Sequence, residues 1–318
     1  MNLLTALRYL VALQEHRHFG RAAQACHITQ PALSNALRAV EREFGVAVVR
    51  RARQFEGFTP EGERVLAAAR RMLREHEALT QELASDALGP RGRLRLAAVP
   101  TAMPLLARFA ARLRARHPGI VPQVLAMSSQ ALEDGLQALS VDLALGYLDR
   151  LPPDRAALAA WPQYTEHYHL LQADERAPAL AAGPPLAWAD AARLPLCLLT
   201  PDMHNRRIVD AAFERAGVAV QPAIETDSVL ALALTVAAGG VVSVLPGAVV
   251  AALRGQAGLR AHPLVSPVVQ TPMGFIAHAR QAPPRALQAA LALVQDADWQ
   301  REAAAHSGPQ PVPGDSAA

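Results

Sequence analysis

Hydrophobic residues in the first 45 positions recur every three or four residues, which is the spacing of amphipathic helices. The pattern predicts helices over residues 3–15, 19–26 and 29–44. Thr29 is placed to cap the third helix, Pro31 falls in its first turn, and Gly45 ends it. The repeating positions are Leu4, Leu7, Leu10 and Val11, then Phe19, Ala22, Ala23 and Cys26, then Leu33, Leu37, Val40 and Phe44.

The third predicted helix carries short polar groups opposite its hydrophobic stripe. Two helices joined by a tight turn, the second polar at its start, describe a helix-turn-helix. The major groove of B-DNA admits one helix, whose leading turn must carry side chains that reach base edges. The alternative is an ordinary three-helix bundle with a solvated polar face. The residues that we expect at a DNA interface on this helix are Thr29, Gln30, Pro31, Ser34, Asn35 and Arg38.

Residues 46–58, VAVVRRARQFEGF, predict two short strands around a basic turn. Such a hairpin beside a helix-turn-helix is a wing. We expect Arg50, Arg51 and Arg53 to lie near DNA phosphates.

A long helix is predicted after the wing, over residues 60–88. Thr59 is a good N-cap, Pro60 fits the first helical position, and acidic residues follow in the first turn. A heptad-like seam of hydrophobic positions then favours pairing with a second copy, the alternative being packing on the helix's own domain. Residues 89–92, GPRG, indicate a hinge. The seam consists of Ala69, Met72, His76, Leu79 and Leu83.

From residue 93 onward, hydrophobic runs typical of buried strands alternate with helical patterns. This alternation predicts parallel sheets with helices on both faces. The polar, proline-rich segment 306–318 predicts a disordered tail. The expected strands are 94–99, 120–127, 141–148, 164–173, 194–200, 221–226, 241–246 and 272–279, and the expected helices are 102–116, 130–139, 204–216, 229–238 and 284–298.

Hydroxyl-rich turns follow several of these strands. Ligands of open α/β sheets bind beyond the carboxyl ends of strands, where helix N-termini direct N–H groups at them. Hydroxyls and helix N-termini together suit a small anion, although Thr101, Ser129 and Ser228 also fit as plain helix caps. The candidate ligand-binding residues are Pro100, Thr101, Ser128, Ser129, Thr200, Met203, His204, Asn205, Arg206 and Thr226.

Composition narrows the class of protein. The 318 residues, 51% hydrophobic and 19% charged, are enough for two folded domains or three small ones. The chain has no lysine; residues 1–60 hold eight arginines against four acids, which favours a polyanionic partner for the N-terminal part. Two cysteines fit a reducing compartment. No hydrophobic run approaches the roughly 20 residues of a membrane span, and the first residues do not resemble a secretory signal, so we expect no membrane partner and a cytoplasmic location.

An enzyme is the main competing class. The sequence contains no GxSxG, Walker loop, HExxH or Cys/His zinc spacing. His167 and His169 alternate on one predicted strand and make at best a two-ligand geometry, so we expect ordinary core or surface histidines rather than metal ligands. Cys197 lies inside a hydrophobic strand and Cys26 inside the helix-turn-helix, where each fits as a small buried side chain. We expect no enzymatic activity, no metal and no cofactor.

Residues 19–59, FGRAAQACHITQPALSNALRAVEREFGVAVVRRARQFEGFT, closely resemble the N-terminal domain of LysR-type transcriptional regulators. The matching positions are Ala22-Ala23, residues 29–34 (TQPALS), residues 41–45 and residues 59–62 (TPEG). Val48-Val49 departs from the family, which usually has leucine and phenylalanine there, so looser wing packing is expected. By resemblance, Gln30, Pro31, Ser34 and Arg38 lie along the DNA, and Arg53 contacts the backbone or minor groove.

The resemblance implies the architecture of the whole chain. It would comprise an N-terminal all-α winged helix-turn-helix (1–60), a linker helix for dimerisation (60–88), and a C-terminal α/β two-lobed effector domain (91–300) resembling type 2 periplasmic binding proteins. Lobe I would span about 91–163 and 268–300, and lobe II 164–267. The expected partners are double-stranded DNA with a pseudo-palindromic operator, a small anionic effector between the lobes, and further copies of the chain as a dimer or tetramer.

Residues 194–218, LPLCLLTPDMHNRRIVDAAFERAGV, resemble the branch of the family that controls cyanate, formate and related small-anion metabolism. This similarity implies a one-carbon anion as the effector, with formate first. The alternatives are an α/β enzyme and a DNA-binding protein without ligand control.

Overall fold

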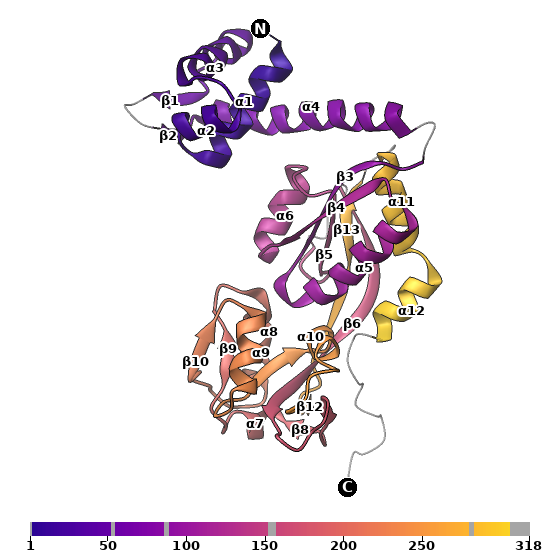
Figure 1. The fold of residues 1–318 in the computed structure, drawn as a ribbon. Helices are drawn as coiled ribbons and strands as arrows, with labels where there is room; N and C mark the ends of the chain where they lie inside the picture. The colour runs from indigo at the N-terminus through magenta and orange to yellow at the C-terminus, as the bar shows by residue number, and fades with distance from the viewer. Residues whose placement is uncertain (1, 52–54, 86–88, 152–156, 280–282, 306–318) are drawn as a thin grey trace. The chain divides into compact units, whose positions relative to one another are not determined.

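The computed structural model describes residues 2–51, 55–85, 89–151, 157–279 and 283–305. The expected tail at 306–318 lies outside these residues. The chain forms two compact units, Met1–Gly89 with Gln137–Ser140, and Pro90–Leu136 with Val141–Ala318. They are called the N-terminal and C-terminal units here (Figure 1).

Three helices, a hairpin and the start of a long helix build the N-terminal unit (Figure 1). The elements are α1 (Leu3–His16), α2 (Phe19–Ala25), α3 (Gln30–Phe44), β1 (Val49–Arg51), β2 (Phe55–Phe58) and α4 (Pro60–Ser85). The Thr29 hydroxyl accepts the Ala32 N–H, and Gly45 ends α3 at φ 69°, so both predicted caps are confirmed. Leu7, Leu10 and Leu33 are fully buried in the core. Phe44, expected in the buried stripe, is 38% exposed because it lies on the last turn of α3.

The hairpin turns back onto the start of α4 through tight backbone packing. The Thr59 hydroxyl accepts the Gly62 N–H at 2.9 Å and donates to the Ala47 carbonyl at 2.6 Å. A Cβ at position 62 would lie 2.0 Å from the Val48 carbonyl oxygen, so only glycine fits there. The TPEG segment therefore joins the hairpin to the helix.

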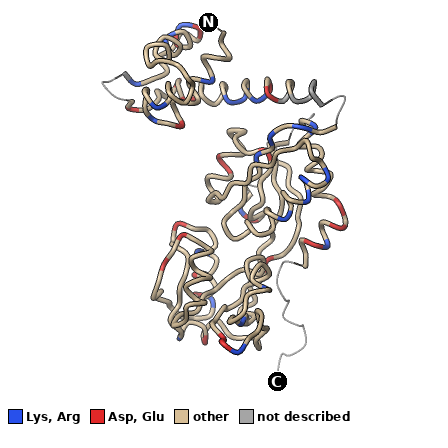
Figure 2. Tube along the Cα trace, in the orientation of Figure 1, with Lys and Arg blue, Asp and Glu red and all other residues tan. Residues whose placement is uncertain are grey.

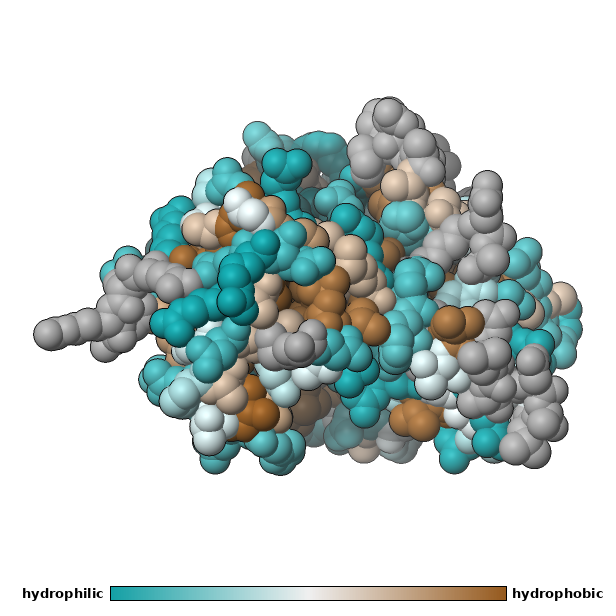
Figure 3. Space-filling view, turned by 90° about the horizontal axis from the view of Figure 1, so that it is seen from above, coloured by the Kyte–Doolittle hydropathy of each residue, from teal (hydrophilic) through white to brown (hydrophobic). Residues whose placement is uncertain are grey.

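The hydrophobic seam of α4 divides into two parts. Ala69 is buried in the core of its own unit, as the alternative interpretation expected for the whole helix. Met72 is 43% exposed and Leu79 is 56% exposed, so the later seam leaves hydrophobic side chains at the surface. In a view from above, hydrophobic groups gather in the middle of a hydrophilic surface (Figure 3). Burial of the Leu83 side chain is not described.

The C-terminal unit holds a nine-stranded sheet of strand order β4-β3-β5-β13-β6-β12-β7, with β11 also paired to β6 and β8 to β12. Its first half, lobe I, packs β3 (Gly92–Ala98), β4 (Ile120–Ala126), β5 (Leu143–Tyr147) and the neighbouring part of β13 (Gln270–His278) against helices. These helices are η1 (Pro100–Ala102), α5 (Met103–Arg116), α6 (Ser129–Gln137), α11 (Arg285–Val294) and α12 (Ala297–Ala305).

The other half, lobe II, has two hydrophobic cores of its own. A two-stranded parallel sheet of β9 and β10 lies in this lobe and joins β11 through a bridge between Leu196 and Val242. The elements of lobe II are β7 (Ala181–Ala182), β8 (Leu186–Ala187), α7 (Trp188–Ala191), β9 (Cys197–Leu199), α8 (His204–Arg215), β10 (Ile224–Thr226), α9 (Val229–Ala237), β11 (Ser243–Pro246), α10 (Gly247–Ala252) and β12 (Leu259–Val265).

One long strand, β6 (Leu158–Ala173), connects the two lobes. Residues up to His167 pair with β13, and residues from Tyr168 onward pair with β11 and β12. All three pairings are antiparallel, whereas β3 pairs in parallel with β4 and β5. The expectation of parallel sheets therefore holds for β3, β4 and β5 and for β9 and β10, but not for β13, which pairs antiparallel with both β5 and β6.

Several element boundaries also differ from the prediction. The strand expected to begin at residue 164 begins at Leu158, and the helix expected over 284–298 is two helices broken at 295–296. The elements η1, β7, β8, α7, α10 and β12 were not predicted. Within the described ranges, no helix is long and apolar enough to cross a bilayer.

Candidate nucleic-acid interface and ligand cleft

The polar side chains predicted on α3 share one surface of the N-terminal unit. Ser34 is half-buried and the others are exposed, as expected for positions three and four residues apart on the solvent face of a helix. The exposed members are Thr29, Gln30, Pro31, Asn35 and Arg38, and Arg42 extends the same face.

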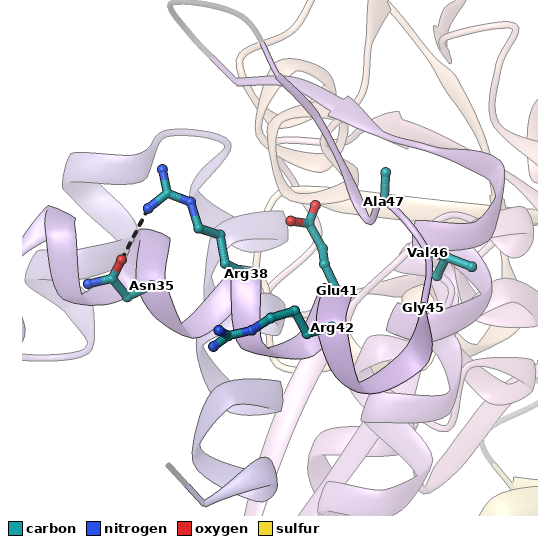
Figure 4. A pocket seen from close by; sticks show the side chains of 7 residues that line it. All are labelled: Asn35, Arg38, Glu41, Arg42, Gly45, Val46 and Ala47. Atoms are coloured by element: carbon teal, nitrogen blue, oxygen red, sulfur yellow. Dashed lines mark hydrogen bonds between the residues drawn. The ribbon is translucent and has the colours of Figure 1, made fainter.

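A hollow lies between α3 and the segment that leads into β1 (Figure 4). Arg38 Nη1 donates to Asn35 Oδ1 at 3.2 Å, which holds the guanidinium along the exposed face. Glu41 points across the hollow, and its Oε1 accepts the N–H groups of Val48 at 3.1 Å and Val49 at 3.4 Å. This carboxylate fixes the hairpin against α3. The sequence pointed to Glu41 only as part of the family match. Its role was not predictable because its backbone partners lie seven and eight positions away in the chain.

The predicted hairpin is present as antiparallel β1 and β2. Arg50 is exposed. Arg51 lies on β1 with its side chain undescribed, and Arg53 lies outside the described residues. Arginines recur along α3, β1 and α4, with acidic positions between them (Figure 2).

A cavity of about 60 Å³ lies in the C-terminal unit where the ends of β3, β5 and β9 meet the starts of three helices. A buried water needs about 10–15 Å³ of such space, so the cavity suits a ligand of a few non-hydrogen atoms. Seven predicted residues line it, and Thr200, Arg206 and Thr226 do not. The predicted lining residues are Pro100, Thr101, Ser128, Ser129, Met203, His204 and Asn205, joined by Val99, Tyr147, Leu199 and Asp202.

The hydroxyls of the cavity have different roles from those expected. Thr101 caps no helix: it is buried in η1, and its Oγ1 lies 3.2 Å from the Tyr147 hydroxyl, a hydrogen bond either atom can donate. Ser128, rather than Ser129, caps α6 by accepting the Ala131 N–H. Ser228 does cap α9, as predicted. The Ser129 hydroxyl therefore has no capping role.

Two polar atoms at the start of α8 have no hydrogen-bond partner among the described residues. They are Nδ2 of Asn205, a side chain only 5% exposed, and Nε2 of His204. The Asn205 amide lies near enough to Tyr147 to favour the ionised phenol, but Nδ2 completes no hydrogen bond. Burial, then the Arg150 charge, lowers the pKa of His204. Unsatisfied buried groups of this kind are expected where a ligand binds.

Arg206 does not supply charge to the cavity. Its guanidinium donates to the Leu199 carbonyl at 2.7 Å, to Glu225 at 2.6 Å and to Asp210 at 2.7 Å, and the side chain is only 9% exposed. Arg206 was predicted to bind the ligand, but it does not line this cavity, and two carboxylates and a carbonyl accept hydrogen bonds from its Nε and Nη1 atoms. Arg206 instead braces the turn before α8.

A buried acidic residue lies on the opposite face of β6 from the two histidines. Tyr164, Glu166 and Tyr168 alternate along this strand, and all three are buried. Burial raises the pKa of Glu166 to about 8, although the Ala248 N–H donates to it at 3.4 Å. Glu166 in turn raises the pKa of Tyr147, which is already raised by burial. The Tyr-x-Glu-x-Tyr alternation was the available signal, and it was missed.

Neither cysteine is arranged for redox chemistry. Cys197 is fully buried in β9, Cys26 is half-buried at the end of α2, and burial raises the pKa of both thiols. A raised pKa leaves little reactive thiolate. Of the core and surface positions that the sequence left open for His167 and His169, the structure places both in the core. Among described side chains, no group of three or more His, Cys, Asp or Glu is placed to hold a metal ion.

The sequence matches two family models. "LysR substrate binding domain" matches residues 87–299, and "Bacterial regulatory helix-turn-helix protein, lysR family" matches residues 4–63. The DNA-binding transcriptional dual regulator OxyR of Escherichia coli (strain K12) is 30% identical over 279 residues, which cover 85% of this chain and 87% of that protein.

Solved structures show the same arrangement of elements. A full-length OxyR variant from Pseudomonas aeruginosa matches with a TM-score of 0.67 and 26% identity, covering 98% of this chain and 99% of that one. Full-length CbnR complexed with its target DNA matches with a TM-score of 0.65 over 96% of this chain and 100% of that one. At 21% identity, the second match is a likeness of fold.

Proposed function

This chain belongs to the LysR family of bacterial DNA-binding transcriptional regulators, and from that premise we propose that it controls transcription in response to a small ligand bound in the cavity of its C-terminal unit. The single observation that carries the proposal is the convergence of unpartnered polar groups on this small cavity. Asn205 and His204, whose Nδ2 and Nε2 atoms are buried without a partner, line the same cavity as the hydroxyl-bearing residues Thr101, Ser128 and Ser129.

The chemistry of the lining favours a ligand rich in hydrogen-bond acceptors, such as a small anion. The amide and hydroxyl groups donate hydrogen bonds, and the starts of α6 and α8 add positive helix ends. Asp202 in the wall opposes a high negative charge. A singly charged or uncharged acceptor fits this balance best.

The expected formate effector has no support from the relatives, whose names include "Hydrogen peroxide-inducible genes activator". A thiol route to peroxide sensing finds no support in the two cysteines, since Cys197 is fully buried and both thiols have raised pKa values. We therefore favour reversible ligand binding over thiol oxidation.

For the DNA-binding half, we propose that Thr29, Gln30, Pro31, Ser34, Asn35 and Arg38 face the major groove, and that Arg51 and Arg53 lie near phosphates. The exposure of the α3 face and the Asn35–Arg38 hydrogen bond support this assignment. In an oligomer, a ligand that favours one lobe arrangement would alter the spacing of the DNA-binding units by its differential affinity for the two arrangements.

Thermal unfolding against a panel of small molecules tests the ligand half. The panel holds formate, cyanate, bicarbonate, phosphate, acetate, larger carboxylates and hydrogen peroxide. A ligand at 100 times its dissociation constant adds about 2.7 kcal/mol to the free energy of unfolding. Thr101→Val should remove that gain, whereas Arg38→Ala should keep it. Peroxide-dependent oxidation of Cys197, seen by mass spectrometry together with altered DNA binding, would contradict reversible binding.

Arg38→Ala, which should keep the stabilisation by ligand, should lose affinity for DNA. With an operator fragment enriched from a random duplex library, its binding should fall by about 10- to 100-fold, as for loss of one base-reading arginine. Thr101→Val should bind that fragment normally without ligand. Loss of both DNA binding and ligand stabilisation in either variant would count against separate modules.

A further inference from the structure

A salt bridge in lobe I reaches a residue of the ligand cavity from outside it. Arg150, which follows β5, places Nε 2.7 Å from Oε1 of Glu133 on α6, and both side chains are 22% exposed. Neither residue lines the cavity. Arg150 Nη1 lies 3.4 Å from Nδ1 of His204, the first residue of α8 in lobe II. Arg150 thus joins Glu133 to the imidazole at its Nδ1 atom.

The chemistry of arginine determines which ring nitrogen carries the hydrogen. A guanidinium has five N–H donors and no acceptor. The contact with Nδ1 therefore requires a lone pair on that atom, and the hydrogen of the neutral ring is on Nε2. Nε2 is the buried atom that has no hydrogen-bond partner among described residues. His204 consequently has an unused N–H donor, and it lines the cavity.

The surroundings of the ring favour its neutral form. Tyr147 packs edge-on against it, with the ring centroids 4.7 Å apart. Burial lowers the pKa of His204 most, followed by the charge of Arg150, and Arg207 acts in the same direction. Asp149 and Glu133 act in the opposite direction, more weakly than burial and Arg150. A protonated ring would also point an N–H at the Arg150 N–H.

We propose that Glu133 and Arg150 are positioning residues that hold His204 with its hydrogen on Nε2, so that the cavity selects ligands with a hydrogen-bond acceptor at that point. The inference rests on the proposed ligand cavity and adds a specificity rule to it. Since Arg150 belongs to lobe I and His204 to lobe II, the same contact joins the two lobes across the cavity.

Nuclear magnetic resonance tests the ring without any ligand. In the full-length protein labelled with ¹⁵N-histidine, at a pH above the pKa of His204, two-bond ¹H–¹⁵N correlations identify the protonated nitrogen; His204→Gln assigns the signal. We expect Nε2–H in the parent protein. Arg150→Met should give a mixture of tautomers and a raised pKa. Arg207→Gln, which removes a nearby charge that donates no hydrogen bond to the ring, should keep Nε2–H. A ring protonated on Nδ1 in the parent protein overturns the inference.

Calorimetric titration with acetate as the probe tests selectivity. Loss of one oriented hydrogen bond, about 1 kcal/mol, corresponds to roughly fivefold weaker binding. We expect that loss in Arg150→Met and His204→Leu, a smaller loss in Glu133→Gln, and near-parent binding in His204→Gln, whose amide N–H reaches the Nε2 position, and in Arg207→Gln. Thermal unfolding confirms that each variant is folded.

Different results would overturn the role of Arg150 and the ligand cavity itself. Parent-like acetate binding in both Arg150→Met and His204→Leu overturns this inference and leaves the ligand cavity standing. Absence of stabilisation of the parent protein by every member of the panel overturns the proposed function, and with it the selection of an acceptor.

Discussion

Glu166 lies on β6 between Tyr164 and Tyr168, and its side chain has no exposed surface. Its Oε2 has no hydrogen-bond partner among the described atoms. Desolvation favours the neutral carboxyl, which accounts for a pKa raised to about 8. A carboxyl group that stays protonated to about pH 8 therefore lies next to the point at which β6 passes from one lobe to the other.

This burial predicts a pH dependence of stability. Between pH 4.5 and about 8, the unfolded chain releases the Glu166 proton while the folded chain keeps it. The contribution of Glu166 to the free energy of unfolding is therefore fully present below pH 4.5. It falls as the pH rises toward about 8, by up to about 1.4 kcal/mol per pH unit. Glu166→Gln should remove this part of the slope in urea unfolding between about pH 5 and pH 8.

Glu175→Gln is the matched control, because Glu175 is exposed and its substitution should leave the slope unchanged. Identical slopes for the parent protein and Glu166→Gln would show that the buried carboxyl is ionised in the folded state.

The hairpin of the N-terminal unit depends on a contact between elements. Glu41 on α3 accepts two backbone N–H groups at the start of β1, at 3.1 and 3.4 Å. Without the carboxylate, these donors lose their partner where Val48 and Val49 are buried. The position of the hairpin beside α3 is therefore set by one side chain.

Glu41→Ala should lower the free energy of unfolding by about 1–3 kcal/mol, the cost of leaving buried donors unsatisfied. It should also weaken operator binding, since the wing is no longer held against α3. Glu41→Gln, which keeps an acceptor oxygen, should recover part of both. Chemical denaturation and a gel-shift titration measure the two effects. Glu43→Ala, an exposed neighbour, serves as the control, and an equal effect there would refute the assignment.

Elements with local signals were predictable from sequence. The caps Thr29, Ser228 and Gly45 define helix ends through hydrogen bonds or backbone angles a few residues away, and α8 and α9 begin where expected. Elements held by distant partners were less predictable. The first residues of β6 are strand because they pair with β13, which follows much later in the chain, and the isolated pattern contains no trace of that pairing.

In the ligand cavity, too, residues with a local signal were predictable and residues held by distant partners were not. The hydroxyl-rich turns pointed to seven of its lining residues, because strand-to-helix turns meet at one edge of a sheet. The role of Arg206 was not predictable, since it depends on Glu225, nineteen positions away. Tyr147 was missed because it ends a fully buried strand, where a tyrosine is expected to belong to the core.

At the scale of the whole molecule, the exposed part of the α4 seam is the surface that we expect to pair with a second copy. Met72 and Leu79 leave hydrophobic surface uncovered in a single chain, and Ala69 turns into the core. A heptad-like hydrophobic seam on a long helix favours pairing with a second copy of the same helix.

Leu79→Glu should therefore shift the protein toward the monomer, because a charge in the seam must lose water when two copies pair. Sedimentation velocity at several concentrations measures the shift. Thr80→Glu adds the same charge beside the seam, at a position next to Leu79 along α4, and should leave the oligomer intact. A dimer of unchanged affinity in Leu79→Glu would move the interface to another surface.

The course of β6 and β13 also sets an order for biosynthesis. Every strand of lobe II has been synthesised once the chain reaches Val265, the end of β12, but lobe I still lacks β13, which lies between β5 and β6 in its sheet. Domains fold as their parts are synthesised, so lobe II can close first while the fully buried β5 waits with one edge unpaired. The segment from Gln270 onward, with β13, α11 and α12, then completes a lobe whose first strand, β3, was made long before at Gly92–Ala98.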